Sequence, residues 1–359
     1  MTPRRTTLIL IAAALAAPRL AAQTDSTRTR TSISGFVDVY YAYDFGRPPS
    51  HDRPFVTQAA RHDEFNLNLA HIALAVDRPS VRARLAVQAG TSVQVNYAAE
   101  PRSGTVSGSE LVRHIQEATI GVRAGSGLWI DAGIYLSYIG WEGWVSSTNP
   151  TYTRSMVAEF SPYYLSGARA TWTAGKHVTM QVHLMNGWQN VAENNDDKAG
   201  GFRIDVTPSD HLTLVYATFL GREQPAVGTM ETRFFQQLMA KGTVGPATWQ
   251  AQIDAGHSGG RSWFGWAGTA SWRLSPATAL ATRIEHYSDP DQVIVATGTP
   301  AGFVANGASI GVDRALPGNV LWRTEARWLR ATDSLFADHG RPAAARSNLT
   351  LVTSLAVSF

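Results

Sequence analysis

The sequence predicts an all-β fold, a transmembrane antiparallel up-and-down β-barrel of about 16 strands (14–18 possible). Three observations predict it. Apolar and polar residues alternate with a period of two along segments longer than the ~5–6 residues of an ordinary strand. Short turns and long loops follow one another in alternation along the chain. The N-terminus has the layout of an export signal, yet no later apolar run approaches the ~20 residues of a membrane-spanning helix.

Residues 1–22 have the three parts of a secretory signal peptide. Arg4 and Arg5 form a basic start, residues 6–17 are an apolar run, and Leu20-Ala21-Ala22 offers a small-residue cleavage site. The polar residues 23–31 are expected to form a periplasmic N-terminal segment, and residues 32–359 the barrel. A retained membrane anchor is the alternative reading of residues 1–22.

Charge and cysteine content narrow the class of protein. Three of the 31 Lys and Arg residues lie in residues 1–22, so the remainder balances the 28 Asp and Glu residues. A near-neutral mature chain gives little support for nucleic-acid binding. The chain has no cysteine, which excludes disulfides and cysteine-based metal sites.

The longest alternating segment is Val81–Tyr97. Its odd positions, such as Leu85 and Val93, are apolar or tolerate apolar surroundings, whereas most even positions are polar or small. We expect one strand over all 17 residues, apolar on one face and polar on the other. The other predicted strands are Ser32–Phe45, Glu64–Val76, Val112–Arg123, Leu128–Ile139, Leu165–Thr173, Val178–Asn186, Gly200–Thr207, His211–Gly221, Thr232–Val244, Ala247–Gly256, Ser262–Leu274, Thr278–Ser288, Val304–Arg314, Val320–Ala331 and Asn348–Phe359.

Two details qualify these strands. In Glu64–Val76 the alternation changes phase near His71, which predicts a β-bulge. Aromatic residues gather toward strand ends, as in the two interfacial girdles of a membrane barrel. Examples are Tyr40, Tyr41, Tyr43 and Phe45 before the first long loop, and Trp172, Trp249, Trp272 and Trp322 near short turns.

Short turns rich in Gly, Pro, Ser, Asn and Asp alternate with mostly longer loops. In an antiparallel meander this places all short turns at one end of the barrel and the long loops at the other. Outer-membrane barrels have this asymmetry, with short periplasmic turns and long extracellular loops. A soluble exported β-sandwich is the alternative, but its Greek-key connections give no reason for strict alternation.

Five segments resemble the OmpL-like outer-membrane β-barrel porin family, namely Gly35–Phe45, Arg61–Leu69, Asn96–Pro101, Ser161–Tyr164 and Asn186–Trp188. They cover the first half of the mature chain, and the second half resembles the family in its alternation and its end. The terminal Phe359 is similar to the signal that the barrel-assembly machinery reads. The resemblance implies an outer-membrane barrel with passive transport, and it supplies no catalytic residue.

With about 16 strands the lumen is wide enough for water, so charges on the polar face are expected to line a channel. The alternative is that these side chains pair across strands and stiffen the wall. Arg slightly outnumbers acid, which predicts at most a weak anion preference. The predicted pore-lining residues are Asp38, Arg82, Arg84, Arg113, Glu117, Arg169, Arg203, Arg283, Glu285, Arg323, Glu325 and Arg327.

The longest predicted loop spans residues 140–164. Loops beyond about 12–15 residues are usually functional or disordered. We hypothesise that this loop folds inward and narrows the pore, with Glu142, Arg154 and Glu159 as constriction candidates. A surface loop that caps the rim is an equally good reading.

Together these features predict an outer-membrane porin of a Gram-negative-type bacterium that passes small hydrophilic solutes or ions by passive diffusion. The alternative is a non-conducting structural or adhesion barrel whose loops block the lumen. Expected partners are outer-membrane lipid, the barrel-assembly machinery through Phe359 and the solutes themselves, while a homo-oligomer stays open. We expect no enzymatic activity, cofactor or metal site.

Overall fold

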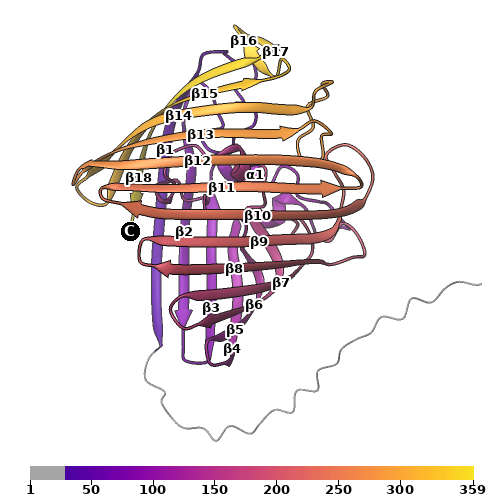
Figure 1. Cartoon of the computed structure of the whole chain (residues 1–359), viewed down its shortest axis with the longest axis vertical. Coiled ribbons are helices and arrows are strands. Elements are labelled where there is room, and N and C mark those ends of the chain that lie inside the picture. The colour runs from indigo at the N-terminus through magenta and orange to yellow at the C-terminus, as the bar shows by residue number, and fades with distance from the viewer. Residues whose placement is uncertain (1–28) are drawn as a thin grey trace, which may run out of the picture.

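The computed structural model describes residues 29–359 (Figure 1). Sixteen antiparallel strands close into one barrel, in the order β1-β18-β15-β14 and then by unit steps down to β2. β1 (Arg30–Asp44) closes the barrel against β18 (Ser347–Ser358), with Val39 opposite Leu355. The predicted fold class is confirmed.

The remaining wall strands follow one another along the chain. They are β2 (Phe65–Asp77), β3 (Val81–Ala89), β4 (Ile115–Gly125), β5 (Leu128–Leu136), β6 (Tyr164–Ala174), β7 (Val178–Met185), β8 (Ala199–Ser209), β9 (Leu212–Glu223), β10 (Glu231–Val244), β11 (Ala247–Ser258), β12 (Arg261–Ser275), β13 (Thr278–Asp289), β14 (Phe303–Leu316) and β15 (Val320–Ala331). The long connections hold a hairpin, β16 (Phe336–Asp338) with β17 (Arg341–Ala345), and the short helices α1 (Thr91–Asn96), α2 (Ser109–Val112), η1 (Ser146–Thr148) and α3 (Met156–Glu159). Within residues 29–359, no helix is long and apolar enough to cross a membrane.

The N-terminal boundary differs slightly from the prediction. β1 begins at Arg30, which pairs with Asp77 of β2, so residues 30 and 31 belong to the barrel and not to a separate segment. The predicted signal peptide lies outside the described residues.

The period-two alternation separates the two faces of the wall. On β1, Asp38 is fully buried inside the barrel, whereas its neighbour Val39 is 44% exposed on the outer face. The change of phase in β2 is real, and it comes from a bulge at Asn68, where the register with β1 shifts between Asp38 and Val39. At the strand ends, Trp172 and Trp322 are exposed near short turns, as expected for the girdles. The prediction that Tyr40 belongs to a girdle is wrong, because its side chain points into the barrel.

The prediction of one strand over Val81–Tyr97 is wrong in its second half. β3 ends at Ala89, and Gly90 takes a φ of +141°, where a Cβ would lie 2.2 Å from the carbonyl oxygen of Asn68. Helix α1 follows, fixed to β2 by a hydrogen bond from the Ser92 hydroxyl to the same carbonyl at 2.8 Å. Val93 and Tyr97 therefore pack inside the barrel instead of facing lipid, while Val95 lies exposed on the helix.

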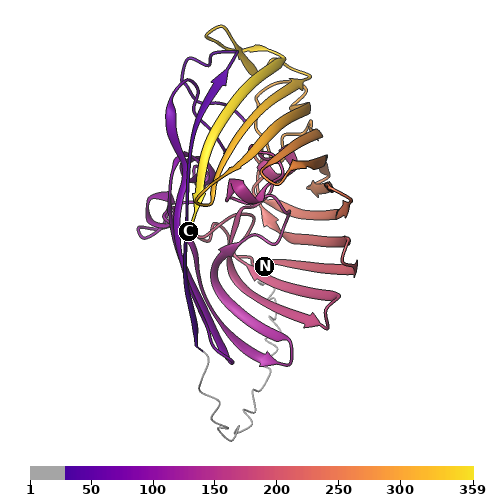
Figure 2. The same ribbon diagram turned by 90° about the vertical axis from the view of Figure 1, so that its left-hand side faces the viewer.

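The barrel interior is not empty. Figure 2 shows irregular segments between the curved walls. Side chains of these segments form an apolar cluster with inward residues of the strands, in which Met156 and Val293 from two connections meet Phe219 and Phe235 of β9 and β10. The alternation predicts a polar inner face, and this prediction is wrong where the long connections pack against inward apolar residues of the strands.

Candidate channel constriction

The connection between β5 and β6, residues 137–163, runs inside the barrel and not over its rim. It starts near β8 to β10, where the Tyr138 hydroxyl donates to Thr218 O at 2.7 Å and Gly140 N donates to Gln237 Oε1 at 2.7 Å. It then reaches the opposite wall, where Thr153 N donates to Glu325 Oε2 at 2.7 Å. The segment therefore crosses the lumen, and we call it the inner loop.

A buried ionic cluster on β13 and β15 holds the middle of the inner loop. Arg283, Glu285, Glu325 and Arg327 are each no more than 2% exposed. Glu285 Oε1 accepts from Arg327 at 2.8 Å, and Glu285 Oε2 accepts from the backbone N–H of Met156 at 2.6 Å. Removing one member of such a cluster leaves an unpaired buried charge, which typically costs about 3–5 kcal/mol.

A second anchor lies closer to the start of the helix η1. Arg323 of β15 pairs with Asp313 of β14 at 2.8 Å and donates to the carbonyl oxygen of Ser146 at 2.6 Å. Asp38 of β1 accepts from the Ser146 hydroxyl at 2.8 Å and from Asn68 Nδ2 at 2.8 Å. Strands on both sides of the β1–β18 pair, where the barrel closes, therefore bind one short piece of the inner loop.

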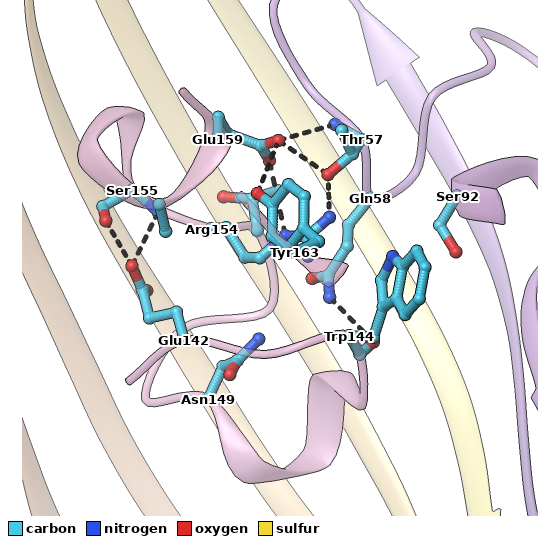
Figure 3. A network of polar contacts seen from close by, with 12 residues as sticks. Thr57, Gln58, Ser92, Glu142, Trp144, Asn149, Arg154, Ser155, Glu159 and Tyr163 are labelled. Atoms are coloured by element: carbon cyan, nitrogen blue, oxygen red, sulfur yellow. Dashed lines mark hydrogen bonds and ion pairs between the residues drawn. The ribbon is translucent and has the colours of Figure 1, made fainter. Parts of the chain in front are cut away.

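The three predicted constriction residues lie together in a polar network (Figure 3). Glu159 accepts from the Thr57 backbone N–H at 3.1 Å and hydroxyl at 2.6 Å, which ties the inner loop to the β1–β2 connection. Arg154 lies 3.8 Å from Glu159 and stacks over the ring of Tyr163. Glu142 accepts two hydrogen bonds from Ser155, and its burial raises its pKa above the ordinary value.

These contacts give the three residues a different place from the one predicted. Glu142, Arg154 and Glu159 are all less than 10% exposed, so they hold the inner loop together and do not face open lumen. Five predicted pore-lining residues, Arg283, Glu285, Arg323, Glu325 and Arg327, are likewise buried in the two anchors, as is Asp38.

The part of the wall formed by β3 to β8, away from the two anchors, carries the accessible charges. Arg82 and Arg169 share one carboxylate, that of Asp131, at 2.5 and 3.1 Å. Arg84 lies 3.7 Å from Glu117, and more than half of its side chain is exposed. We call this region the open wall; its other predicted member is Arg203, which pairs with Asp205 at 2.7 Å.

Arg113 does not join the open wall. The predicted strand starts at Val112, but β4 starts at Ile115, and Arg113 ends the short helix α2 in the connection before it. Its guanidinium contacts His114 at 3.2 Å on the surface. The prediction that Arg113 lines the pore as part of a strand is therefore wrong.

Two segments of the sequence fit the Gly-x-Ser-x-Gly spacing of a hydrolase nucleophile elbow, which requires a strand, a sharp turn and a helix. Residues 307–311 lie in the middle of the strand β14, so they form no such turn. Residues 256–260 are the end of β11 and the turn into β12, where Ser258 pairs with Arg261 across the hairpin. The Ser258 hydroxyl is buried and has no hydrogen-bond partner among residues 29–359, so no described base activates it.

Solved structures with the same fold are outer-membrane proteins. The anion-selective porin from Comamonas acidovorans is 11% identical with a TM-score of 0.59, and the match covers 92% of this chain and 100% of that one. Salmonella typhi OmpF in complex with daunomycin is 9% identical with a TM-score of 0.60, covering 92% and 98%. OmpT of Vibrio cholerae is 9% identical with a TM-score of 0.56, also covering 92% and 98%.

A search of curated proteins by sequence finds no significant relative. The family described as "Putative beta-barrel porin-2, OmpL-like" matches residues 30–359, which is the whole barrel. The resemblance seen in five short segments is thereby confirmed over residues 30–359. The chain belongs to this OmpL-like porin family and is an outer-membrane β-barrel porin.

Proposed function

We propose that small hydrophilic solutes and ions diffuse between the inner loop and the open wall, and that the inner loop sets the size limit. One observation carries this proposal. The inner loop is hydrogen-bonded to β13, β15 and β1, whereas the arginine side chains of β3 to β8 keep part of their surface accessible. A water-filled path along that wall follows from this asymmetry.

The charge of the open wall favours anions weakly. Its inward-facing cations outnumber its acids, and each acid already pairs with at least one arginine. The cations are Arg82, Arg84, Arg123, Arg169 and Arg203, and the acids are Glu117, Asp131 and Asp205. Charges that line a narrow pore select ions by sign, and partial neutralisation limits the bias.

Planar-bilayer recording tests the proposal. We expect stepwise conductance from the purified barrel and, under a KCl gradient, a reversal potential displaced toward the chloride equilibrium potential. Liposome swelling with sugars of increasing size should then give a sharp size limit. A reversal potential on the potassium side would contradict the charge argument.

The alternative is a non-conducting barrel, and the apolar cluster formed by the long connections and inward residues of the strands favours it. Met156, Val293 and Phe303 are fully or almost fully buried in that cluster. Complete closure predicts no conductance steps at any voltage, although the protein would still insert into the membrane. Bilayer recording separates the two functions directly.

We also propose partners for the barrel. The aliphatic outer face contacts lipid, and the ring of Phe359 lies against Gly35, where the barrel-assembly machinery would find it at the end of β18. Vibrio cholerae OmpT has been solved in a trimer form, and we propose the same assembly here. Crosslinking in outer-membrane vesicles would reveal three-fold species. We assign no enzymatic activity to the channel.

A further inference from the structure

A cleft of about 610 Å³ opens near the ends of β9 and β10, apart from the two anchors of the inner loop. This volume lies within the range typical of small-molecule sites. Its lining combines charged, amide and apolar side chains from five connections and two strands. We call it the vestibule cleft, lined chiefly by Phe160, Trp188, Asn190, Glu223, Arg233 and Ile294.

Glu223 and Arg233 bring opposite charges to the lining of the vestibule cleft, which also includes Glu159 of the inner loop. Glu223 and Arg233 are each only 3% exposed, yet no ion pair joins them or links either one to another described residue. Glu223 Oε1 accepts from the backbone N–H of Trp188 at 2.9 Å, and Arg233 Nη2 donates to the carbonyl oxygen of Gln224 at 3.2 Å. Buried charges are expensive unless they are paired, so this arrangement calls for a partner with both signs of charge.

The guanidinium is held rigidly. It lies over the rings of Trp188, 5.4 Å from the centroid, and of Trp263, 5.9 Å from the centroid. Stacking of this kind fixes a cation without neutralising it. Arg233 Nε and Asn190 Nδ2 also have no hydrogen-bond partner among residues 29–359. Residues that line the cleft therefore hold two buried hydrogen-bond donors without partners and a carboxylate that accepts a single backbone hydrogen bond.

We infer that the vestibule cleft binds a zwitterionic α-amino acid before it enters the channel. The carboxylate of the solute would pair with Arg233 beside Asn190, the ammonium with Glu223, and an apolar side chain would lie against Phe160 and Ile294. A simple anion or a neutral sugar leaves at least one of the two buried charges unmatched. This inference deepens the proposed function and rests on it, because the cleft supplies solute to the same lumen.

The test uses the full-length barrel in a planar bilayer with L-leucine as the probe. Leucine should reduce the ion current in a saturable manner. Two analogues each lack one charge: 4-methylpentanoate has no ammonium, and 3-methylbutylamine has no carboxylate. We expect each analogue to need at least about tenfold higher concentration for half-block, the effect of losing one charge-assisted hydrogen bond. Equal block by leucine and 4-methylpentanoate would overturn the inference.

Two variants test which charged residue of the cleft binds which charged group of leucine. Arg233→Met should raise the half-blocking leucine concentration about tenfold or more. Glu223→Gln should remove the preference for leucine over 4-methylpentanoate, a change that a merely structural glutamate would not cause. Arg261→Met is the matched control, because Arg261 pairs with Glu231 at 2.8 Å outside the cleft. Unchanged discrimination in Glu223→Gln would contradict the assignment even if Arg233→Met fails to fold.

The outcomes separate this inference from the proposed function. Conductance without saturable block by leucine refutes the amino-acid site and leaves the porin intact. A barrel that never conducts refutes the proposed function, and equilibrium dialysis of labelled leucine against the detergent-solubilised protein then decides the binding site alone. Saturable binding there, lost in Arg233→Met, supports the cleft, and its absence overturns the inference.

Discussion

Arg283 of β13 contacts Thr153 of the inner loop with both ends of its guanidinium. Nη2 donates to the Thr153 hydroxyl at 2.9 Å, and Nη1 donates to the Thr153 carbonyl oxygen at 2.5 Å. The same side chain lies 3.2 Å from Glu285 and 3.4 Å from Glu325. Thr153, which lies 130 residues earlier in the chain, is thus attached to the wall by charge-assisted hydrogen bonds, which are stronger than neutral ones.

Arg283→Met should release the inner loop. The substitution removes the donor to Thr153 and leaves the carboxylates of Glu285 and Glu325 with less positive charge beside them. We therefore expect a loss of about 3–5 kcal/mol in unfolding free energy. The freed loop should make the single-channel current noisier. Urea unfolding in detergent and bilayer recording measure the two effects. The matched control is Arg84→Met on the exposed part of the open wall, and an equal loss in both variants would contradict the anchor.

Deleting residues 143–151 should raise the single-channel conductance. This piece of the inner loop is closed on itself, because Gly143 N donates to Asn149 Oδ1 at 2.9 Å and Asn149 Nδ2 donates back to Gly143 O at 3.0 Å. Its removal takes mass out of the lumen while the wall strands stay intact. Conductance that does not change would show that the inner loop does not form the narrowest part of the path.

Adjacent residues on β3 test the two faces of the wall. Leu85 is 48% exposed on the outer face, and Leu85→Arg should cost roughly 2–4 kcal/mol if it lies near mid-membrane. Arg84→Ala should leave folding nearly unchanged and shift the reversal potential toward cations. Refolding yield in lipid vesicles measures the first effect, and a KCl gradient measures the second. The reverse outcome would mean that the two faces are exchanged.

Strand alternation was sufficient to predict the barrel, because each wall residue faces either lipid or the interior whatever its distant neighbours are. The end of β3 shows the limit of that argument. Val93 and Tyr97 continue the alternation, but the φ of Gly90 takes the chain off the wall, and the contacts of Ser92 with β2 were not visible in the local pattern.

The alternation along each strand also does not indicate which inward-facing charges are exposed to water. Arg82 and Arg323 have the same local pattern, yet Arg323 is buried because an inner loop more than 170 residues earlier in the chain reaches it. The apolar inward residues Phe219 and Phe235 carried a usable signal, since large aromatics at polar-face positions beside long connections indicate that those connections pack inside.

Asp131→Asn should strengthen the anion preference. Asp131 is 2% exposed and holds both Arg82 and Arg169, so its loss leaves two cations of the open wall without their shared carboxylate. The reversal potential should move further toward that of chloride, whereas Arg169→Gln should move it the other way. Identical shifts in the two variants would show that permeating ions do not sense this wall.

Glu142→Gln should change how stability depends on pH. Burial raises the pKa of Glu142 above its ordinary value of 4.5, so folding favours the protonated form. The stabilising contribution of this group is therefore complete below about pH 4.5 and is lost as the pH rises through the raised pKa. Glutamine keeps the acceptor for Ser155 without the charge, so the variant should melt at a higher temperature than the parent at pH 8 and at the same temperature at pH 4. Circular dichroism in detergent measures both, with the substitution Asp196→Asn at an exposed carboxylate as control. A difference that is the same at both pH values would show that the buried carboxyl does not titrate between them.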